Sequence, residues 1–167
     1  MPELPEVETI VRQLNRKIRG LRIKQVWLDC PKLLKGKINQ QKFQEIVVGK
    51  TILKVRRKGK NIIFDLEDDW SCLIHLKLTG RILLGEDDFI SQDPYIHFKL
   101  ELSDNTYLAL SDLRKFAKVV LAKTEEIEAL EEIKKIAKER CLNFDGYVVH
   151  KLFLSDIEGM VLNSKKA

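Results

Sequence analysis

Between Thr51 and Ala122 the sequence consists of short apolar segments of five to eight residues, each bounded by turn-forming residues. The segments are TILKVRR, NIIFDLED, SCLIHLKL, RILLG, YIHFKLEL, TYLALS and FAKVVLA. Between them lie turn signals such as KGK, EDDW, TG, QDP and SDN, in which Gly, Pro, Asn and Asp are common. Seven such segments in succession predict a sandwich or a barrel of β-strands, of which we favour a two-sheet β-sandwich.

A helical pattern precedes this β region. Apolar residues recur at helical spacing from Val7 to Ile18, Pro5 suits the first turn of a helix, and Gly20 follows as a stop signal. Residues 21–28 then predict a strand, and residues 38–50 predict a short helix that ends at its glycine. We expect both helices to pack at the margin of the sandwich.

The helical pattern returns after the β region, at TEEIEALEEIKKIAKER, residues 124–140. Its acidic residues come first and its basic residues last, an order that suits the helix dipole. We therefore expect a mainly β fold with flanking helices (α+β). In this fold residues 1–122 form the sandwich domain and residues 123–167 form a helical extension.

The composition fits a globular chain that works inside the cell. Of the 167 residues, 44% are hydrophobic and 33% are charged, and no apolar run approaches the length of a membrane span. No secretory signal is recognisable at the start, so we expect a cytoplasmic protein, nucleoid-associated if the source is prokaryotic. The three cysteines, Cys30, Cys72 and Cys141, are far apart and form no CxxC pair, which indicates reduced thiols and predicts no metal site.

Positive charge is concentrated in the first three quarters of the chain. Residues 1–123 carry 23 lysines and arginines against 16 acidic residues, whereas residues 124–167 carry 7 against 9. A dense basic stretch is KVRRKGK, residues 54–60, which indicates either a polyanion-binding surface or an ordinary solvated face. Charge alone does not choose between them.

The opening MPELPEVE combines a proline behind the initiator methionine with three glutamates. Methionine before proline is commonly removed, which would leave the secondary amine of Pro2 as the N-terminus. An α-amino group has a pKa near 8, well below that of lysine, so it can act as a nucleophile at neutral pH. Glu3 and Glu6 could then move protons at the reacting centre. The alternative is that these glutamates simply stabilise the positive end of the helix.

Four segments, in order, resemble one family of repair enzymes, the formamidopyrimidine-DNA glycosylase and endonuclease VIII family. The segment PELPEVE is similar to its N-terminal signature, and RRKGKNIIF, residues 56–64, to its basic β-hairpin. LIHLKLTGRIL, residues 73–83, is similar to its His-Leu-Gly-Met-Ser-Gly segment, and LSDLRKFAKVVL, residues 110–121, to its Asp-x-Arg-Arg/Lys-Phe-Gly segment. The Arg-Lys-Phe form favours the formamidopyrimidine branch.

The resemblance implies a bifunctional DNA glycosylase and AP lyase that removes oxidised purines such as 8-oxoguanine and formamidopyrimidines in base excision repair. Pro2 would attack C1′ of the damaged nucleotide and form a Schiff base, Glu3 would handle protons at the sugar, and Glu6 would orient or protonate near the lesion. Lys60 would hold the adjacent phosphate. The alternative for Lys60 is a solvated hairpin tip.

The same resemblance implies a set of DNA-binding residues. His75 would contact the DNA backbone, although a satisfied histidine at the core edge is an equal alternative, and Arg57 of the basic hairpin would also bind DNA. Leu78, Arg114 and Phe116 would fill the gap left by an everted nucleotide, as apolar and arginine wedges do. Core packing is the alternative for Phe116. Asp112 is expected to brace its loop through hydrogen bonds.

Some positions differ from the family pattern. Leu78 stands in place of a methionine, Lys77 and Ala117 in place of glycines, and Tyr95 where a histidine is common. The family's helix-two-turn-helix motif and four-cysteine zinc finger are not recognisable, so no cofactor is expected in this chain. The expected partner is double-stranded DNA with oxidised bases or abasic sites. We expect the protein to be a monomer and expect no membrane partner. The alternative function is a non-catalytic module that binds damaged DNA.

Overall fold

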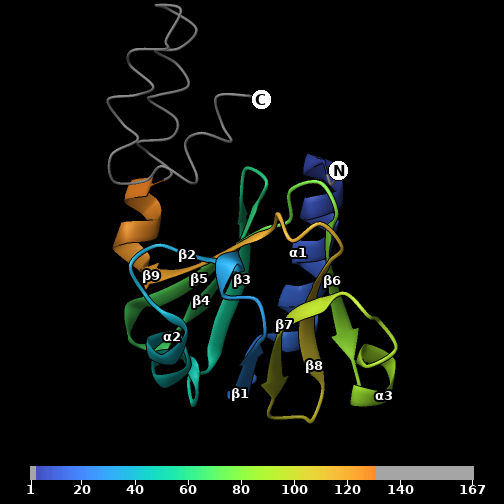
Figure 1. The fold of residues 1–167 in the computed structure, drawn as a ribbon. Coiled ribbons are helices and arrows are strands. Elements are labelled where there is room, and N and C mark those ends of the chain that lie inside the picture. Colours follow the sequence, from blue (N-terminus) through green and yellow to red (C-terminus); the bar gives the residue numbers. More distant parts are fainter. Residues whose placement is uncertain (1–2, 131–167) are drawn as a thin grey trace, which may run out of the picture. The chain divides into compact units, whose positions relative to one another are not determined.

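The structure is a computed structural model and describes residues 3–130. The chain divides after Ala122 into two units, and each is described by itself. The first unit holds the helices and strands that are labelled in Figure 1. Of the second unit, residues 124–130 are helical, while the rest of the expected helical extension lies outside the described residues.

The first unit is mainly β, as expected, and its strands form two sheets (Figure 1). The four-stranded sheet has the order β1-β7-β8-β6 and the five-stranded sheet the order β2-β9-β5-β4-β3. The strands of the first sheet are β1 (Ile23–Leu28), β6 (Gly80–Gly85), β7 (Ile96–Leu102) and β8 (Tyr107–Asp112). Those of the second are β2 (Leu34–Lys35), β3 (Ile52–Lys58), β4 (Asn61–Leu66), β5 (Trp70–His75) and β9 (Lys118–Lys123). The two-sheet sandwich is therefore confirmed.

Three helices and two 3-10 turns complete this unit. The helices are α1 (Leu4–Ile18), α2 (Gln40–Val47) and α3 (Asp87–Ile90), and the turns span Pro31–Leu33 and Glu67–Asp69. Helix α1 buries Val7, Val11, Leu14 and Ile18, the stripe that its sequence period predicts. It lies along β3, where the side-chain oxygen of Asn15 accepts the Val55 N–H at 2.8 Å. Helix α1 is thereby fixed to an edge strand whose N–H would otherwise lack a strand partner.

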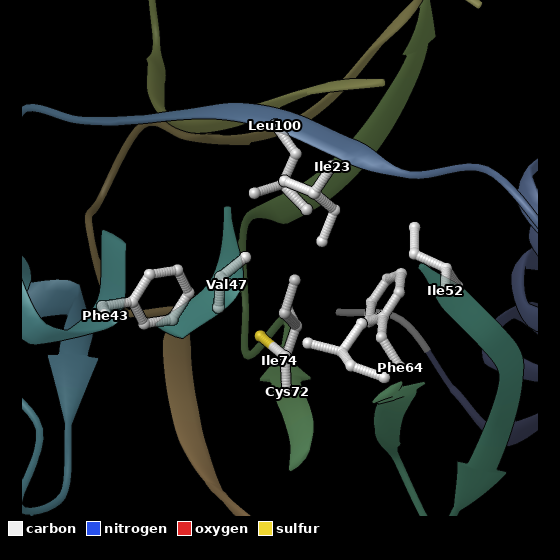
Figure 2. A pocket seen from close by; sticks show the side chains of 9 residues that line it. Ile23, Phe43, Val47, Ile52, Phe64, Cys72, Ile74 and Leu100 are labelled. Carbon is white, nitrogen blue, oxygen red and sulfur yellow. The ribbon is translucent and has the colours of Figure 1, made fainter. Parts of the chain in front are cut away.

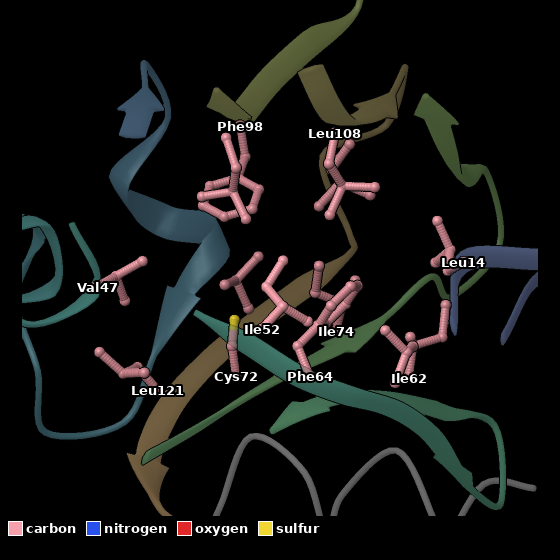
Figure 3. Close-up of a cluster of buried hydrophobic side chains, with 14 of the residues drawn as sticks. Leu14, Val47, Ile52, Ile62, Phe64, Cys72, Ile74, Phe98, Leu108 and Leu121 are labelled. Carbon is pink, nitrogen blue, oxygen red and sulfur yellow. The ribbon is translucent and has the colours of Figure 1, made fainter. Parts of the chain in front are cut away.

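The core lies between the two sheets and joins their inner faces. Figure 3 shows Phe98 and Leu108 of the first sheet facing Phe64 and Ile74 of the second. The ring of Phe43 on α2 meets Phe98 edge to face, with centroids 5.7 Å apart. Burial of these apolar faces is the main force that holds the sheets together.

A small internal cavity lies in this core (Figure 2). Its lining is apolar apart from the Cys72 thiol, and it is made by Ile23, Phe43, Val47, Ile52, Phe64, Leu66, Cys72, Ile74 and Leu100. Burial raises the pKa of the Cys72 thiol to about 12, so the thiol stays protonated at neutral pH. The cavity is therefore a packing feature of the core rather than a site for chemistry.

Several predicted strand boundaries are wrong by two or three residues, including the start of β1 and the end of β4, and two of these errors fall at one end of the sandwich. The segment SCLIHLKL does not continue as a strand to Leu78, because β5 ends at His75 and Lys77 adopts a left-handed φ of +59°. The segment FAKVVLA does not begin as a strand at Phe116, because β9 starts at Lys118. Within the described part of the chain, β2 and α3 were not predicted, since each is too short to show a period.

No helix among residues 3–130 is both long enough and apolar enough to cross a membrane.

A substitution at Gly80 tests the tight turn that follows β5. A Cβ atom at this position would lie 2.4 Å from the carbonyl oxygen of Leu76, a backbone atom that cannot move aside. We expect Gly80→Ala to lower the free energy of unfolding by about 3 kcal/mol, measured by urea denaturation. Gly85→Ala is the matched control at the other end of β6. Its Cβ would meet only the exposed Phe89 ring, and we expect a loss below about 1 kcal/mol. Equal losses would contradict the close approach.

Candidate functional site

The start of α1 places two carboxylates side by side. Glu3 precedes the helix, and its backbone N–H donates to Glu6 Oε2 at 3.1 Å. This bond satisfies a group at the helix start and gives Glu6 the stabilising role that the sequence left open. Pro2 lies outside the described residues, so its expected role as nucleophile stays a prediction. Both glutamates are exposed and accessible to a ligand.

The tip of the β3–β4 hairpin meets this helix start. Lys58 pairs with Asn61 across a two-residue turn, and Gly59 takes the first turn position with φ of +61°. Lys60 follows, and its Nζ lies 3.3 Å from Glu3 Oε2. The Lys60 side chain is 30% exposed, so it lies against the helix start instead of extending freely into solvent. The structure thus brings together Glu3, Glu6 and Lys60 from positions more than fifty residues apart.

A second charge pair fixes the same hairpin to α1. Arg57 Nε donates to Glu8 Oε1 at 2.9 Å, and its guanidinium also donates to the Gly59 carbonyl at 3.1 Å. Arg12 Nε contacts the other Glu8 oxygen at 3.1 Å. The hydrogen bond from Arg57 lowers the pKa of the Glu8 carboxyl from its usual value of 4.5, with smaller help from Arg12. Glu8 was not predicted as a site residue, although it belongs to the same acidic opening.

Two loops cross between the sheets at the hairpin end of the sandwich. His75 at the end of β5 pairs with Asn61, beside the hairpin tip, and residues 76–79 then lead to Gly80 in the other sheet. Gly80 in turn pairs with Asp112, after which residues 113–117 lead back to β9. Figure 1 shows the hairpin tip and the start of α1 at this end. The register therefore gathers the hairpin and both loops at one end.

His75 is oriented by the first loop. Its Nδ1 accepts the backbone N–H of Lys77 at 3.1 Å. A neutral imidazole whose Nδ1 accepts carries its proton on Nε2, so Nε2 is the donor of this ring. The contact supports the reading of His75 as a satisfied residue at the core edge, and its expected contact with a DNA backbone stays a prediction.

The buried carboxylate of Asp112 joins the two loops. Its Oδ1 accepts the Thr79 hydroxyl and the Arg114 N–H, the latter at 3.2 Å, and its Oδ2 accepts the Ala117 N–H at 2.7 Å. Its own carbonyl accepts the Lys115 N–H at 3.3 Å. Asp112 therefore braces the loop as expected, and Thr79 extends the brace to the first loop. Ala117 is tolerated in place of glycine because its φ is not positive.

The two loops present four side chains outward. Leu78 is 44% exposed, Leu113 59% and Phe116 49%, and the Arg114 guanidinium stacks over the Phe116 ring at 5.5 Å. The core-packing alternative for Phe116 is therefore wrong. Leu113 was not predicted as a site residue, although a leucine between charged residues in a turn is a sequence signal that could have indicated it.

The cysteines of this chain do not fit the zinc finger that the family pattern implies. Such a finger needs four cysteines, whereas this chain has three. Cys72 is buried in the core with a protonated thiol, and Cys30 is distant from it in the sequence. Among residues 3–130 no cluster of three or more His, Cys, Asp or Glu residues could hold a metal ion.

The structure thus combines a two-sheet sandwich with a basic hairpin, an acidic helix start and apolar loop tips at one end, and comparison with known proteins shows its family. Residues 1–119 match the model of the formamidopyrimidine-DNA glycosylase N-terminal domain. The chain belongs to the formamidopyrimidine-DNA glycosylase family.

Individual relatives agree with this assignment. The chain is 35% identical over 142 residues to the formamidopyrimidine-DNA glycosylase of Pelotomaculum thermopropionicum, covering 83% of this chain and 50% of the relative. It is 37% identical over 128 residues to that of Desulfitobacterium hafniense, covering 75% and 45%. The chain thus spans about half the length of the curated relatives it matches.

Solved structures show the same fold. A crystal structure of Lactococcus lactis FPG (MutM) with DNA containing FAPY-dG aligns with a TM-score of 0.72 and 26% identity, covering 83% of this chain and 56% of that one. MutM with DNA containing carbocyclic 8-oxo-G aligns with a TM-score of 0.74 and 30% identity, covering 80% and 49%.

Asp112→Asn tests the brace between the loops. On either side of the side chain the asparagine NH₂ would face a backbone N–H, that of Arg114 or that of Ala117, which would lose its acceptor. We expect a loss of about 2–3 kcal/mol in the free energy of unfolding, measured by urea denaturation. Asp104→Asn makes the same change at an exposed turn and should cost below about 1 kcal/mol. A small loss at Asp112 would contradict the brace.

Glu8→Gln tests the clamp on the hairpin through its pH dependence. Because the folded-state pKa of Glu8 is lowered from 4.5, its stabilising effect is present above pH 4.5 and is lost as the pH falls through the folded-state value. We expect the parent to be more stable than Glu8→Gln at pH 7, and the difference to shrink as the pH is lowered below 4.5 in urea denaturation. A difference that does not change with pH would exclude ionised Glu8 as its source.

Proposed function

We propose that this chain carries the catalytic residues of a bifunctional DNA glycosylase and AP lyase that removes oxidised purines in base excision repair. The observation that carries the proposal is the ion pair between Glu3 and Lys60. It puts a phosphate-binding type of cation next to the residue that follows Pro2. A proton carrier and a phosphate anchor are thereby in contact, and the proposed nucleophile is the residue bonded to Glu3 in the chain.

The Pro2 amine is the nucleophile in this proposal, after removal of Met1. Its nitrogen bonds to C1′ of the damaged nucleotide while the bond from C1′ to the base breaks, and the base leaves with a proton. Opening of the sugar ring at O4′ gives an iminium. Glu3 and Glu6, both exposed beside the helix start, transfer the protons of these steps.

The iminium makes the C2′ proton acidic, and its removal breaks the bond from C3′ to the 3′ phosphate. A second elimination breaks the bond at C5′, and water then releases the sugar fragment from Pro2. Lys60 binds the phosphate next to the damaged sugar throughout, as a compact cation does. A phosphate that approaches Lys60 competes with the Glu3 carboxylate, so binding of DNA would free Glu3 for proton transfer.

The proposed partner is double-stranded DNA with oxidised bases or abasic sites. Structures of FPG proteins that align with this chain contain DNA with FAPY-dG, 8-oxo-G or an abasic site, and this supports the choice. Leu78, Arg114 and Phe116 would enter the gap left by the everted nucleotide, and Arg57 and His75 would contact the backbone. We propose a monomer that acts on DNA in the cytoplasm. Residues 1–122 are its sandwich domain and residues 123–167 a helical extension.

Borohydride trapping tests the proposal. The 167-residue chain is incubated with duplex DNA containing 8-oxoguanine or an abasic site, reduced with borohydride, and examined for a covalent adduct. We expect an adduct with the parent and a strong loss with Pro2→Gly. Lys60→Met should lower the adduct yield by roughly 10-fold or more, because it removes a charge-assisted contact. Lys54→Met, an exposed lysine of the same hairpin, is the matched control and should trap like the parent.

Two results would contradict this function. Equal trapping by Pro2→Gly, or a mass spectrum in which Met1 is retained, would exclude the Pro2 amine as nucleophile. DNA binding without any adduct would instead favour the alternative, a non-catalytic module that binds damaged DNA.

A further inference from the structure

Leu113 is the most exposed of the large apolar side chains among residues 3–130, at 59%. A single exposed leucine needs no explanation, since folded proteins expose much apolar surface. Leu113, however, lies in the loop that also presents Arg114 and Phe116, and beside the loop that presents Leu78. Three exposed apolar groups around one arginine form a patch, which is typical of a contact surface.

The backbone around Leu113 is fixed rather than free to bury this side chain. Asp112 before it is fully buried and pairs with Gly80, and the Arg114 N–H after it donates to Asp112 Oδ1. The Lys115 and Ala117 N–H groups are also bonded to Asp112. Leu113 is therefore held between two anchored residues, with its side chain exposed.

The surroundings of Leu113 fit a polyanion that offers apolar faces. Arg114 and Lys115 follow it in the same loop, and Lys58 and Lys60 belong to the hairpin at the same end of the sandwich. The carboxylate next to it, Asp112, is buried and bonded to the loop. Nucleic acid combines phosphates with base faces, and apolar side chains enter base steps that are already partly unstacked.

We propose that Leu113 is an additional wedge, which packs against a base next to the gap left by the everted nucleotide. The inference rests on the proposed function, since it needs DNA to bind at this end of the sandwich. In this proposal Leu113 contacts a base and not the reacting sugar, so it acts as a specificity-determining residue. It increases the preference for DNA with such a gap. In intact DNA the bases are stacked and leave no space for the leucine side chain.

The role of Leu113 is tested with two fluorescent DNA duplexes. They have the same sequence, except that one carries a tetrahydrofuran abasic-site analogue. Their dissociation constants for the full chain are measured by anisotropy at low salt. We expect Leu113→Ala to lower the ratio of the two dissociation constants by roughly 5- to 20-fold, because most of the leucine's apolar burial is lost. The dissociation constant for the intact duplex should change little. Leu113→Met keeps the apolar volume and should keep the preference, whereas Leu113→Asn should lose it.

Leu53→Ala is the matched control, because Leu53 is also exposed, at 49%, but lies at the far end of β3 from the hairpin tip. It should bind both duplexes like the parent. If the parent prefers the analogue and Leu113→Ala keeps that preference, or weakens both duplexes equally, the role of Leu113 is wrong while the proposed function stands. If the parent shows no preference, recognition of damaged DNA fails, and the role of Leu113 fails with it.

Discussion

Two sheets that bury one face against each other must be joined by chain segments that cross between them. In this protein two such segments start at the same end of the sandwich. The 76–79 and 113–117 loops follow strands whose register ends at His75 and Asp112. Asp112 is buried at this end and accepts hydrogen bonds from both loops. Because the carboxylate is anchored in the core, the loop tips can stay exposed without losing their positions. The exposed positions of Leu78, Leu113 and Phe116 depend on that arrangement.

The charge pairs between α1 and the β3–β4 hairpin have a different role. Lys60 with Glu3 and Arg57 with Glu8 are partly exposed pairs, which typically contribute little to the free energy of unfolding. They form where packing of α1 against the sheet has placed the acidic helix start next to the basic hairpin. Because the Lys60–Glu3 pair contributes little, its replacement by a lysine–phosphate pair in the proposed function would cost little free energy.

Most of the fold could be predicted because its signals are local. The stripe of α1 and the seven apolar segments after Thr51 each correspond to an observed element. The errors fall where local preference competes with a close approach in space. The strand pattern continues through Leu78, but Gly80 packs against the Leu76 carbonyl and Lys77 takes a left-handed φ, so the strand stops earlier. The missing β2 depends on a parallel partner in β9, which no local pattern contains.

For the candidate site, too, some features follow from the sequence and others only from the tertiary structure. The sequence by itself determined which residue types are present: a Met-Pro start with glutamates, a basic hairpin with a glycine turn, and an Asp-Leu-Arg-Lys-Phe loop. Only the tertiary structure decided that Lys60 meets Glu3, that Glu8 holds Arg57, and that Thr79 and Asp112 join two loops. Strand register and helix packing set these distances, and both arise from burial of side chains that lie far apart in the sequence. A local pattern can specify a side chain and its strand, but the partner it meets follows from how the whole core closes.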